Sequence, residues 1–195
     1  MLVIEPTNGR ELTHWSQINW TAVAANVRHL QGRIYRAAAH EAHAQVKNLH
    51  KLMVRSMSAK LKAIRQVTQE NSGKQTPGID GVVCDTPQKR LALLQDGLSL
   101  KDYRPKPVKR CYIPKSSGGQ RPLGIPIQKD RVMQALVKLA LEPEWESRFE
   151  ANSYGFRPGR CTMDAITALH TSMSRQGASQ WVRDADIKGC LDHPS

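Results

Sequence analysis

The chain has 195 residues, 39% of them hydrophobic and 24% charged, which is enough for one medium domain or two small ones. Lys and Arg total 29 against 17 Asp and Glu, so the formal net charge is +12 at pH 7. Such an excess favours a polyanionic partner, nucleic acid before an anionic membrane surface. No apolar run approaches the roughly 18 residues of a spanning helix. The four cysteines form no Cys-x-x-Cys pair, which argues against a disulfide scaffold or cysteine zinc finger. We therefore expect a cytoplasmic protein without membrane contacts.

The N-terminal third is expected to be helical and basic. Residues 1–18 show no hydrophobic period and are interpreted as a loose lead-in. From about Asn19, apolar residues recur at three- and four-residue steps, which is typical of one helix face; they are Val23, Val27, Leu30 and Ile34. A second stripe, with a break near Ser56, consists of Val46, Leu49, Met53, Met57, Leu61 and Ile64.

Cations interleave with this second stripe, and residues 42–69 contain no Asp or Glu. A solvated helix face is the simpler interpretation, but helices built only for solubility usually mix charges of both signs. We therefore predict contact with nucleic acid in this segment, and its candidate RNA-binding residues are Arg55, Lys60, Lys62 and Arg65.

The middle of the chain alternates turns with short elements. A turn-rich break covers 71–81, and a short helix is expected from Thr86 to Leu100 with Pro87 in its first turn. Two short apolar runs flank Ser116-Ser-Gly-Gly119, which predicts a β-hairpin. Helical spacing returns over 130–141, and Pro143 is expected to interrupt or restart that helix.

The C-terminal part is expected to hold one helix and one strand. Thr162 is predicted to cap a helix that carries Met163, Ile166, Leu169 and Met173. Residues 180–187 are predicted to form a strand in which Asp184 and Asp186 share one face. Paired carboxylates at a strand end suit divalent metal ions, although a solvated strand end is the alternative.

The segment from Lys101 to Arg131 contains nine cationic residues but only two acidic ones, Asp102 and Asp130. Lys115 and Arg121 bracket the glycine turn, where backbone amides and two cations suit a phosphate group. An ordinary basic hairpin loop is the alternative. Lys109 and Arg110, at the start of the first predicted strand, complete the candidate RNA-binding set.

Several ordered blocks resemble the group II intron-encoded reverse transcriptases, also called maturases. Residues 65–81, which end in Thr-Pro-Gly-Ile-Asp-Gly, resemble the N-terminal block of that family, and 112–126, Tyr-Ile-Pro-Lys-Ser-Ser-Gly-Gly-Gln-Arg-Pro-Leu-Gly-Ile-Pro, resemble its first fingers block. Asp130-Arg-Val-Met-Gln-Ala-Leu136 and Leu141-Glu-Pro-Glu-Trp-Glu146 follow in the expected order. Asn152-Ser-Tyr-Gly-Phe-Arg-Pro-Gly-Arg160 and Asp184-Ala-Asp-Ile-Lys-Gly-Cys190 resemble the second block and the start of the first catalytic palm motif.

This resemblance implies an α+β fold in which basic N-terminal helices precede the fingers and palm of a right-hand polymerase. It divides the chain into the lead-in 1–18, an RNA-binding extension 19–81, and fingers with a truncated palm over 82–195. It implies that Asp186 is a catalytic residue that binds Mg²⁺ together with the carbonyl of Ile187, and that Lys115 and Arg121 grip the incoming nucleotide's triphosphate. The implied partners are group II intron RNA or other structured RNA and, in the full-length family, template-primer and dNTP.

The sequence also departs from the family pattern. Leu191 stands where relatives carry an aromatic residue that excludes ribonucleotides, and no Tyr-Ala-Asp-Asp motif occurs in the 195 residues. Because the metal site needs carboxylates from two motifs, Mg²⁺ is expected only in a completed site, and we expect no polymerase activity from this chain alone. Three hypotheses follow: a truncated reverse transcriptase of a mobile element, half of an enzyme completed by a separate C-terminal fragment, or a non-catalytic RNA-binding splicing helper.

Overall fold

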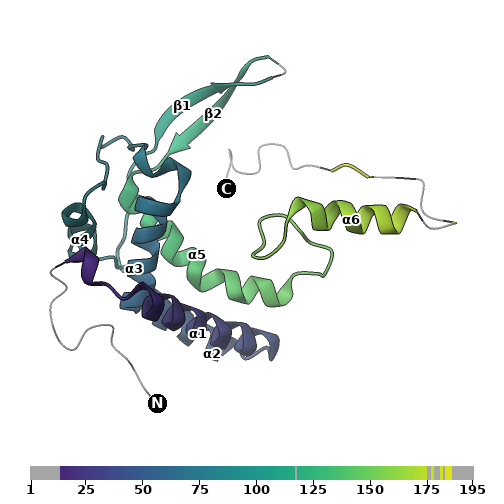
Figure 1. The fold of residues 1–195 in the computed structure, drawn as a ribbon, viewed down its shortest axis with the longest axis horizontal. Coiled ribbons are helices and arrows are strands. Elements are labelled where there is room, and N and C mark those ends of the chain that lie inside the picture. The colour runs from purple at the N-terminus through teal and green to yellow at the C-terminus, as the bar shows by residue number, and fades with distance from the viewer. Residues whose placement is uncertain (1–13, 117, 175–176, 178–180, 182, 186–195) are drawn as a thin grey trace. The chain divides into compact units, whose positions relative to one another are not determined.

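The computed structural model describes residues 14–116, 118–174, 177, 181 and 183–185. Its helices and strands are, in chain order, α1 (Trp20–Ala39), α2 (His43–Arg55), α3 (Met57–Arg65), α4 (Pro87–Gln95), β1 (Lys109–Pro114), β2 (Gln120–Ile125), α5 (Gln128–Arg148) and α6 (Thr162–Met173) (Figure 1). The chain divides into two compact units, the first ending at Arg148 and the second beginning at Phe149. The predicted α+β class is confirmed by these helices and the two-stranded sheet.

The core of the first unit lies where α1, α2, α3 and α5 pack against one another. The predicted helix faces supply it, since Val23, Val27, Ile34, Met53 and Leu61 are all fully buried. Burial of each such side chain contributes about 1.5–3 kcal/mol relative to exposure. Within the part of the chain that the structure describes, no helix is long and apolar enough to cross a membrane.

Side chains at the helix ends explain where the first helices begin and break. The side chain of Asn19 accepts a hydrogen bond from the backbone N–H of Ala22 at 3.0 Å and caps α1. Ser56 has extended backbone angles, φ −62° and ψ 128°, which confirms the predicted break between α2 and α3. Beyond Arg65 the helix widens into one π-helical turn, Gln66–Glu70, before the turn-rich segment begins.

Two expectations for this unit are wrong in part. Trp15 and Ile18 fall in the predicted loose lead-in, yet both are buried in the core, and Trp15 donates through its indole N–H to Gln69 at 3.2 Å. Met57 was expected in the buried stripe but is exposed. The extended residue Ser56 interrupts the helix just before it, so Met57 does not continue the buried face of α2. Residues 1–13 of the lead-in lie outside the described residues.

Pro143 does not interrupt the last helix of this unit, contrary to expectation, because α5 runs through it to Arg148. Proline has no N–H, so the carbonyl of Leu139, four residues earlier, loses its helical partner. Gln31 on α1 fills the gap, since its Nε2 donates to that carbonyl at 3.3 Å. Tertiary packing thereby satisfies the carbonyl and holds the helix together at the proline.

In the second unit, a loop over 149–161 leads into α6. The Arg157 guanidinium is buried and donates to the carbonyls of Glu150 and Ser153, both at 2.7 Å. The N-cap of α6 is Cys161, one residue before the predicted Thr162, and its backbone N–H donates to the Asp164 carboxylate at 2.8 Å. A carboxylate at the third helical position suits the positive end of the helix dipole, which explains the earlier start.

The Gln31–Leu139 hydrogen bond yields a double-mutant test. Gln31→Met removes the donor with little change in shape and should lower the free energy of unfolding by about 1–2 kcal/mol, because the buried carbonyl is left unpaired. In a Pro143→Ala background the new N–H of residue 143 pairs with that carbonyl. Gln31→Met should then lower the free energy of unfolding clearly less than it does in the parent. Urea unfolding of the four proteins measures the difference; equal costs in both backgrounds would show that Gln31 does not compensate for the proline.

Candidate nucleotide and RNA interface

The predicted hairpin is present and projects from the helices of the first unit (Figure 1). β1 and β2 pair antiparallel with Ile113 opposite Arg121 and Pro114 opposite Gln120. Gly118 and Gly119 both have left-handed backbone angles, φ +84° and +83°, and this is what closes the turn. The Lys115 N–H donates to the Gly119 carbonyl at 3.1 Å, so the pairing continues one step beyond the strands.

The register places the two predicted triphosphate-binding cations on one face of the hairpin. Side chains alternate along a strand and directly opposed residues share a face. Lys115 therefore lies on the same side as Ile113 and its partner Arg121, in a diagonal pair whose Cβ atoms are typically about 7–8 Å apart. Both side chains are exposed, and neither forms a hydrogen bond or ion pair with another described residue. This geometry leaves both cations available to one anionic group.

The predicted RNA-binding residues of the hairpin lie on opposite faces. Lys109, opposite Ile125, is on the face of Lys115 and Arg121, whereas Arg110, opposite Gly124, is on the other face beside Tyr112. Both are exposed, so cations line the hairpin on both sides.

A second group of cations lies on α2. Arg55 is exposed in its last turn, and Lys47 and Lys51 precede it at four-residue steps and are also exposed. Residues at this spacing follow one side of a helix. We call Lys47, Lys51 and Arg55 the basic row. The first two were not among the predicted RNA-binding residues, although their four-residue spacing was the signal that could have identified them.

The cations of α3 are less accessible than expected. Five of the nine residues of α3 are buried, and Lys60 and Lys62 are half-buried between them. The Arg65 Nε lies 2.9 Å from a Glu70 carboxylate oxygen, and its guanidinium carbon lies 4.6 Å from the ring centroid of Trp20. Arg65 thus contributes to packing, whatever its further role in RNA binding.

The first turn of α5 binds the segments that lead into and out of the hairpin. The buried Asp130 carboxylate accepts a hydrogen bond from the Lys106 backbone N–H at 3.0 Å, three residues before β1, and another from the Tyr103 hydroxyl. The Arg131 Nε donates to the Pro126 carbonyl at 3.1 Å, one residue after β2. Consecutive residues of one helix therefore fix the entry and the exit of the hairpin.

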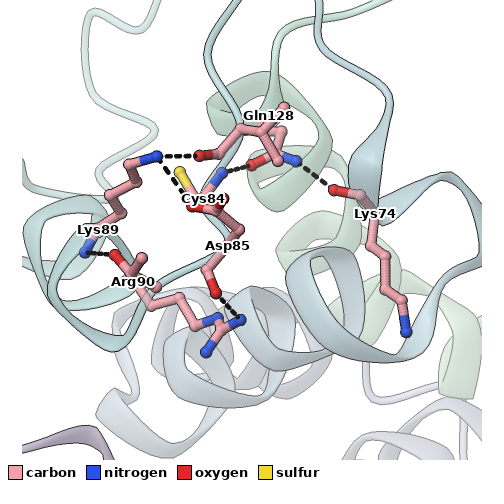
Figure 2. Close-up of polar contacts among 8 residues, drawn as sticks. Lys74, Cys84, Asp85, Lys89, Arg90 and Gln128 are labelled. Atoms are coloured by element: carbon pink, nitrogen blue, oxygen red, sulfur yellow. Dashed lines mark hydrogen bonds and ion pairs between the residues drawn. The ribbon is translucent and has the colours of Figure 1, made fainter.

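The same turn also holds the segments that join the other helices. Arg131 donates to the carbonyls of Gly73, at 2.9 Å, and Thr76, directly after the basic helices. Figure 2 shows Gln128 between two further segments: its Oε1 accepts from the Cys84 N–H and its Nε2 donates to the Lys74 carbonyl, both at 2.7 Å. Lys129 pairs with Asp96, just beyond α4. We call Gln128, Lys129, Asp130 and Arg131 the polar hub.

The polar hub and its surroundings also shift ionisation. Burial, reinforced by Asp130, raises the pKa of Tyr103 above its ordinary value and keeps the hydroxyl a donor. Burial lowers the pKa of Arg131, while Asp80 opposes that shift. The hydrogen bond from Lys129 lowers the pKa of Asp96. Burial raises the pKa of Cys84, so this thiol is not a candidate nucleophile.

The predicted metal-binding residues belong to the C-terminal end of the sequence. Asp186 and Ile187, together with Leu191, lie outside the described residues, as does half of the predicted strand 180–187, and its described residues 181 and 183–185 belong to no strand. Asp184 is described and exposed. Among the described residues, no group of three or more His, Cys, Asp or Glu side chains is arranged to hold a metal ion.

Comparison with known proteins decides the family. Residues 15–96 match the N-terminal domain of reverse transcriptase, and residues 113–193 match reverse transcriptase (RNA-dependent DNA polymerase). The protein YkfC of Escherichia coli is 41% identical over 133 residues, which cover 65% of this chain and 35% of YkfC. The group II intron-encoded protein LtrA of Lactococcus lactis is 40% identical over 129 residues, 63% of this chain and 20% of LtrA. The chain belongs to the group II intron reverse transcriptase and maturase family.

Within this family the chain corresponds to the N-terminal part. It spans about a third or less of the length of these curated relatives. A mitochondrial nuclear intron maturase 1 from Arabidopsis thaliana is 38% identical over 68 residues, 35% of this chain and 9% of that protein. The two matched regions contain the two cationic surfaces, with the basic row in the first and Lys115 and Arg121 in the second.

The polar hub gives a stability prediction. Gln128→Leu removes the side-chain acceptor of the buried Cys84 N–H and the side-chain donor to the partly buried Lys74 carbonyl. It should therefore lower the free energy of unfolding by about 2–5 kcal/mol. Gln134 lies exposed on the same helix, so Gln134→Leu is the matched control and should change stability by no more than about 0.5 kcal/mol. Chemical denaturation compares the two; similar small losses for both variants would contradict the role given to Gln128.

Proposed function

We propose that this chain acts as the nucleic-acid- and nucleotide-binding N-terminal part of a group II intron reverse transcriptase. The basic row on α2, together with Lys60 and Lys62, contacts structured RNA, with group II intron RNA as the natural ligand, whereas Arg65 is engaged by Glu70 and Trp20. The hairpin places Lys115 and Arg121 at the triphosphate of an incoming nucleotide and Lys109 and Arg110 at nucleic acid. A cytoplasmic location is part of the same proposal and rests on the isolated cysteines.

The observation that carries this proposal is that some cations are engaged in contacts within the fold, whereas others are exposed and free to bind a ligand. Between Lys101 and Arg131, the two cations of the polar hub are committed to Asp96 and to backbone carbonyls. Lys115 and Arg121 have no such partner among the described residues and share one exposed face. Because a lysine and an arginine on one face of a hairpin suit a phosphate group, the geometry favours an anion-binding role over a solvated loop.

Polymerisation is proposed to need more than these 195 residues supply. Asp186 and the carbonyl of Ile187 are proposed Mg²⁺ ligands, and Mg²⁺ would neutralise charge on the triphosphate and activate the primer hydroxyl. That chemistry requires a second carboxylate motif, which relatives of this family carry and this sequence does not contain. A segment with that motif, continuous with these residues or on a separate C-terminal fragment, would complete the site.

RNA binding is tested by removing charge from each surface. Replacing Lys47, Lys51 and Arg55 with Gln should weaken binding of an RNA duplex with a single-stranded extension, and should reduce the magnitude of the slope of log K against log salt by roughly 2. Lys138→Gln is the control, since Lys138 is exposed on α5 beside Glu142. Fluorescence anisotropy over a salt series gives the slopes, and an unchanged slope in the triple variant would refute RNA contact at the basic row.

Triphosphate binding is tested at the hairpin. The double variant Lys115→Gln/Arg121→Gln should bind dNTP at least about tenfold more weakly, because hydrogen bonds to charged groups contribute about 1.5–3 kcal/mol each. Isothermal titration with and without MgCl₂ measures the affinity, with Lys138→Gln again as control. Equal affinities in the parent and the double variant would place the triphosphate elsewhere.

Catalysis is tested separately from binding. The pure 195-residue chain should give no primer extension on an RNA template with Mg²⁺ and dNTPs, even when bound to the template. Template-dependent product from the pure chain would overturn this part of the proposal while leaving the two binding predictions intact.

A further inference from the structure

Arg131 contacts three carbonyls from two different parts of the first unit. Its guanidinium donates to Pro126, at the exit of the hairpin, and to Gly73 and Thr76, which follow the basic helices α2 and α3. Asp130, its neighbour, holds the entry of the hairpin through the Lys106 N–H. The two residues therefore join the hairpin to the segment that ends the basic helices.

Little else in the first unit orients the hairpin. Within the described part of the chain its strands pair only with each other, and most of their side chains are exposed, including Tyr112, Ile113 and Leu123. A two-stranded ribbon without a packed face is held mainly at its ends. The hydrogen bonds at its base thus determine where its tip lies.

We infer that Arg131, assisted by Asp130, is a positioning residue that fixes the hairpin, with Lys109 and Arg110 as well as Lys115 and Arg121, relative to the basic row. Two charged surfaces at a fixed separation bind one polyanion far more tightly than either does alone, because the second contact is made at a high effective concentration. The inference rests on the proposed function for its consequence, but the fixed geometry itself is independent of any ligand.

The chemistry of the site explains why an arginine is needed. Only a planar guanidinium offers several N–H donors in a rigid fork, whereas a lysine ammonium is a compact charge on a flexible stem. Arg131→Lys keeps the charge but cannot bridge the same three carbonyls. Asp130→Asn keeps the shape but leaves one of two donors, the Lys106 N–H or the Tyr103 hydroxyl, without its acceptor.

The first experiment measures the geometry without RNA. Nitroxide labels at Ser116→Cys, in the hairpin turn, and Ala44→Cys, exposed on α2, report their separation by pulsed electron paramagnetic resonance, in a chain whose Cys111, Cys161 and Cys190 are serine. The parent should give one narrow distance distribution. Arg131→Lys and Asp130→Asn should broaden it, whereas Arg148→Lys, on the same helix, should not.

The second experiment measures the consequence for binding of the same RNA duplex with a single-stranded extension. In the parent, Lys109→Gln/Arg110→Gln, which removes the hairpin cations assigned to nucleic acid, should weaken binding about tenfold. In the Arg131→Lys background the same pair should weaken binding less than about twofold, because the hairpin no longer acts together with the basic row. Circular dichroism and thermal melting confirm that each variant is folded, and Asp130→Asn replaces Arg131→Lys if the latter unfolds.

The outcomes separate the two claims. Distance distributions as narrow in both folded variants as in the parent would overturn the inference. A broadened distribution together with the lost hairpin contribution supports it. If the parent does not bind RNA, the proposed function fails, while the distance measurement still decides whether Arg131 positions the hairpin.

Discussion

The structure of the first unit depends on the polar hub at the start of α5. Four consecutive side chains, Gln128 to Arg131, satisfy backbone groups or charges in segments 73–76, 84, 96, 103–106 and 126. Irregular segments cannot satisfy their own backbone groups, so each needs an external partner or water. Gly78 shows how tightly they pack, because a Cβ there would lie 2.5 Å from the Ile127 Cα. One helical turn therefore fixes connections that are far apart in sequence.

This arrangement separates two roles that basic residues play in one small protein. Arg131 and Lys129 stabilise the fold, and Arg65 packs on Trp20 and pairs with Glu70. The basic row and the hairpin cations, in contrast, point to solvent without partners among the described residues. Net charge alone would not distinguish these groups. The division gives the proposed RNA and triphosphate contacts their specific candidates, and both surfaces belong to the first compact unit.

Much of the local structure followed from the sequence, because local signals specify it. Hydrophobic spacing predicted α1 and α2, the glycine turn predicted the hairpin, and Thr86 with Pro87 predicted the start of α4, where the Thr86 hydroxyl accepts from the Lys89 N–H. The errors arose where distant residues decide. Gln31 sustains α5 through Pro143, and the core buries Trp15 in the supposed lead-in. The polar hub could not be predicted either, since Asp130 and Arg131 acquire most of their partners when loops 24 to 58 residues away fold against them.

The central claim is that side chains of the polar hub hold irregular backbone as firmly as a helix or sheet would. Amide hydrogen exchange by nuclear magnetic resonance tests it at Cys84 and Lys106, whose N–H groups donate to Gln128 and Asp130 and lie outside any helix or strand. The account predicts that both amides exchange as slowly as those of buried α5 residues such as Leu136, because they open only when the unit unfolds. Exchange at rates typical of exposed loops would contradict it.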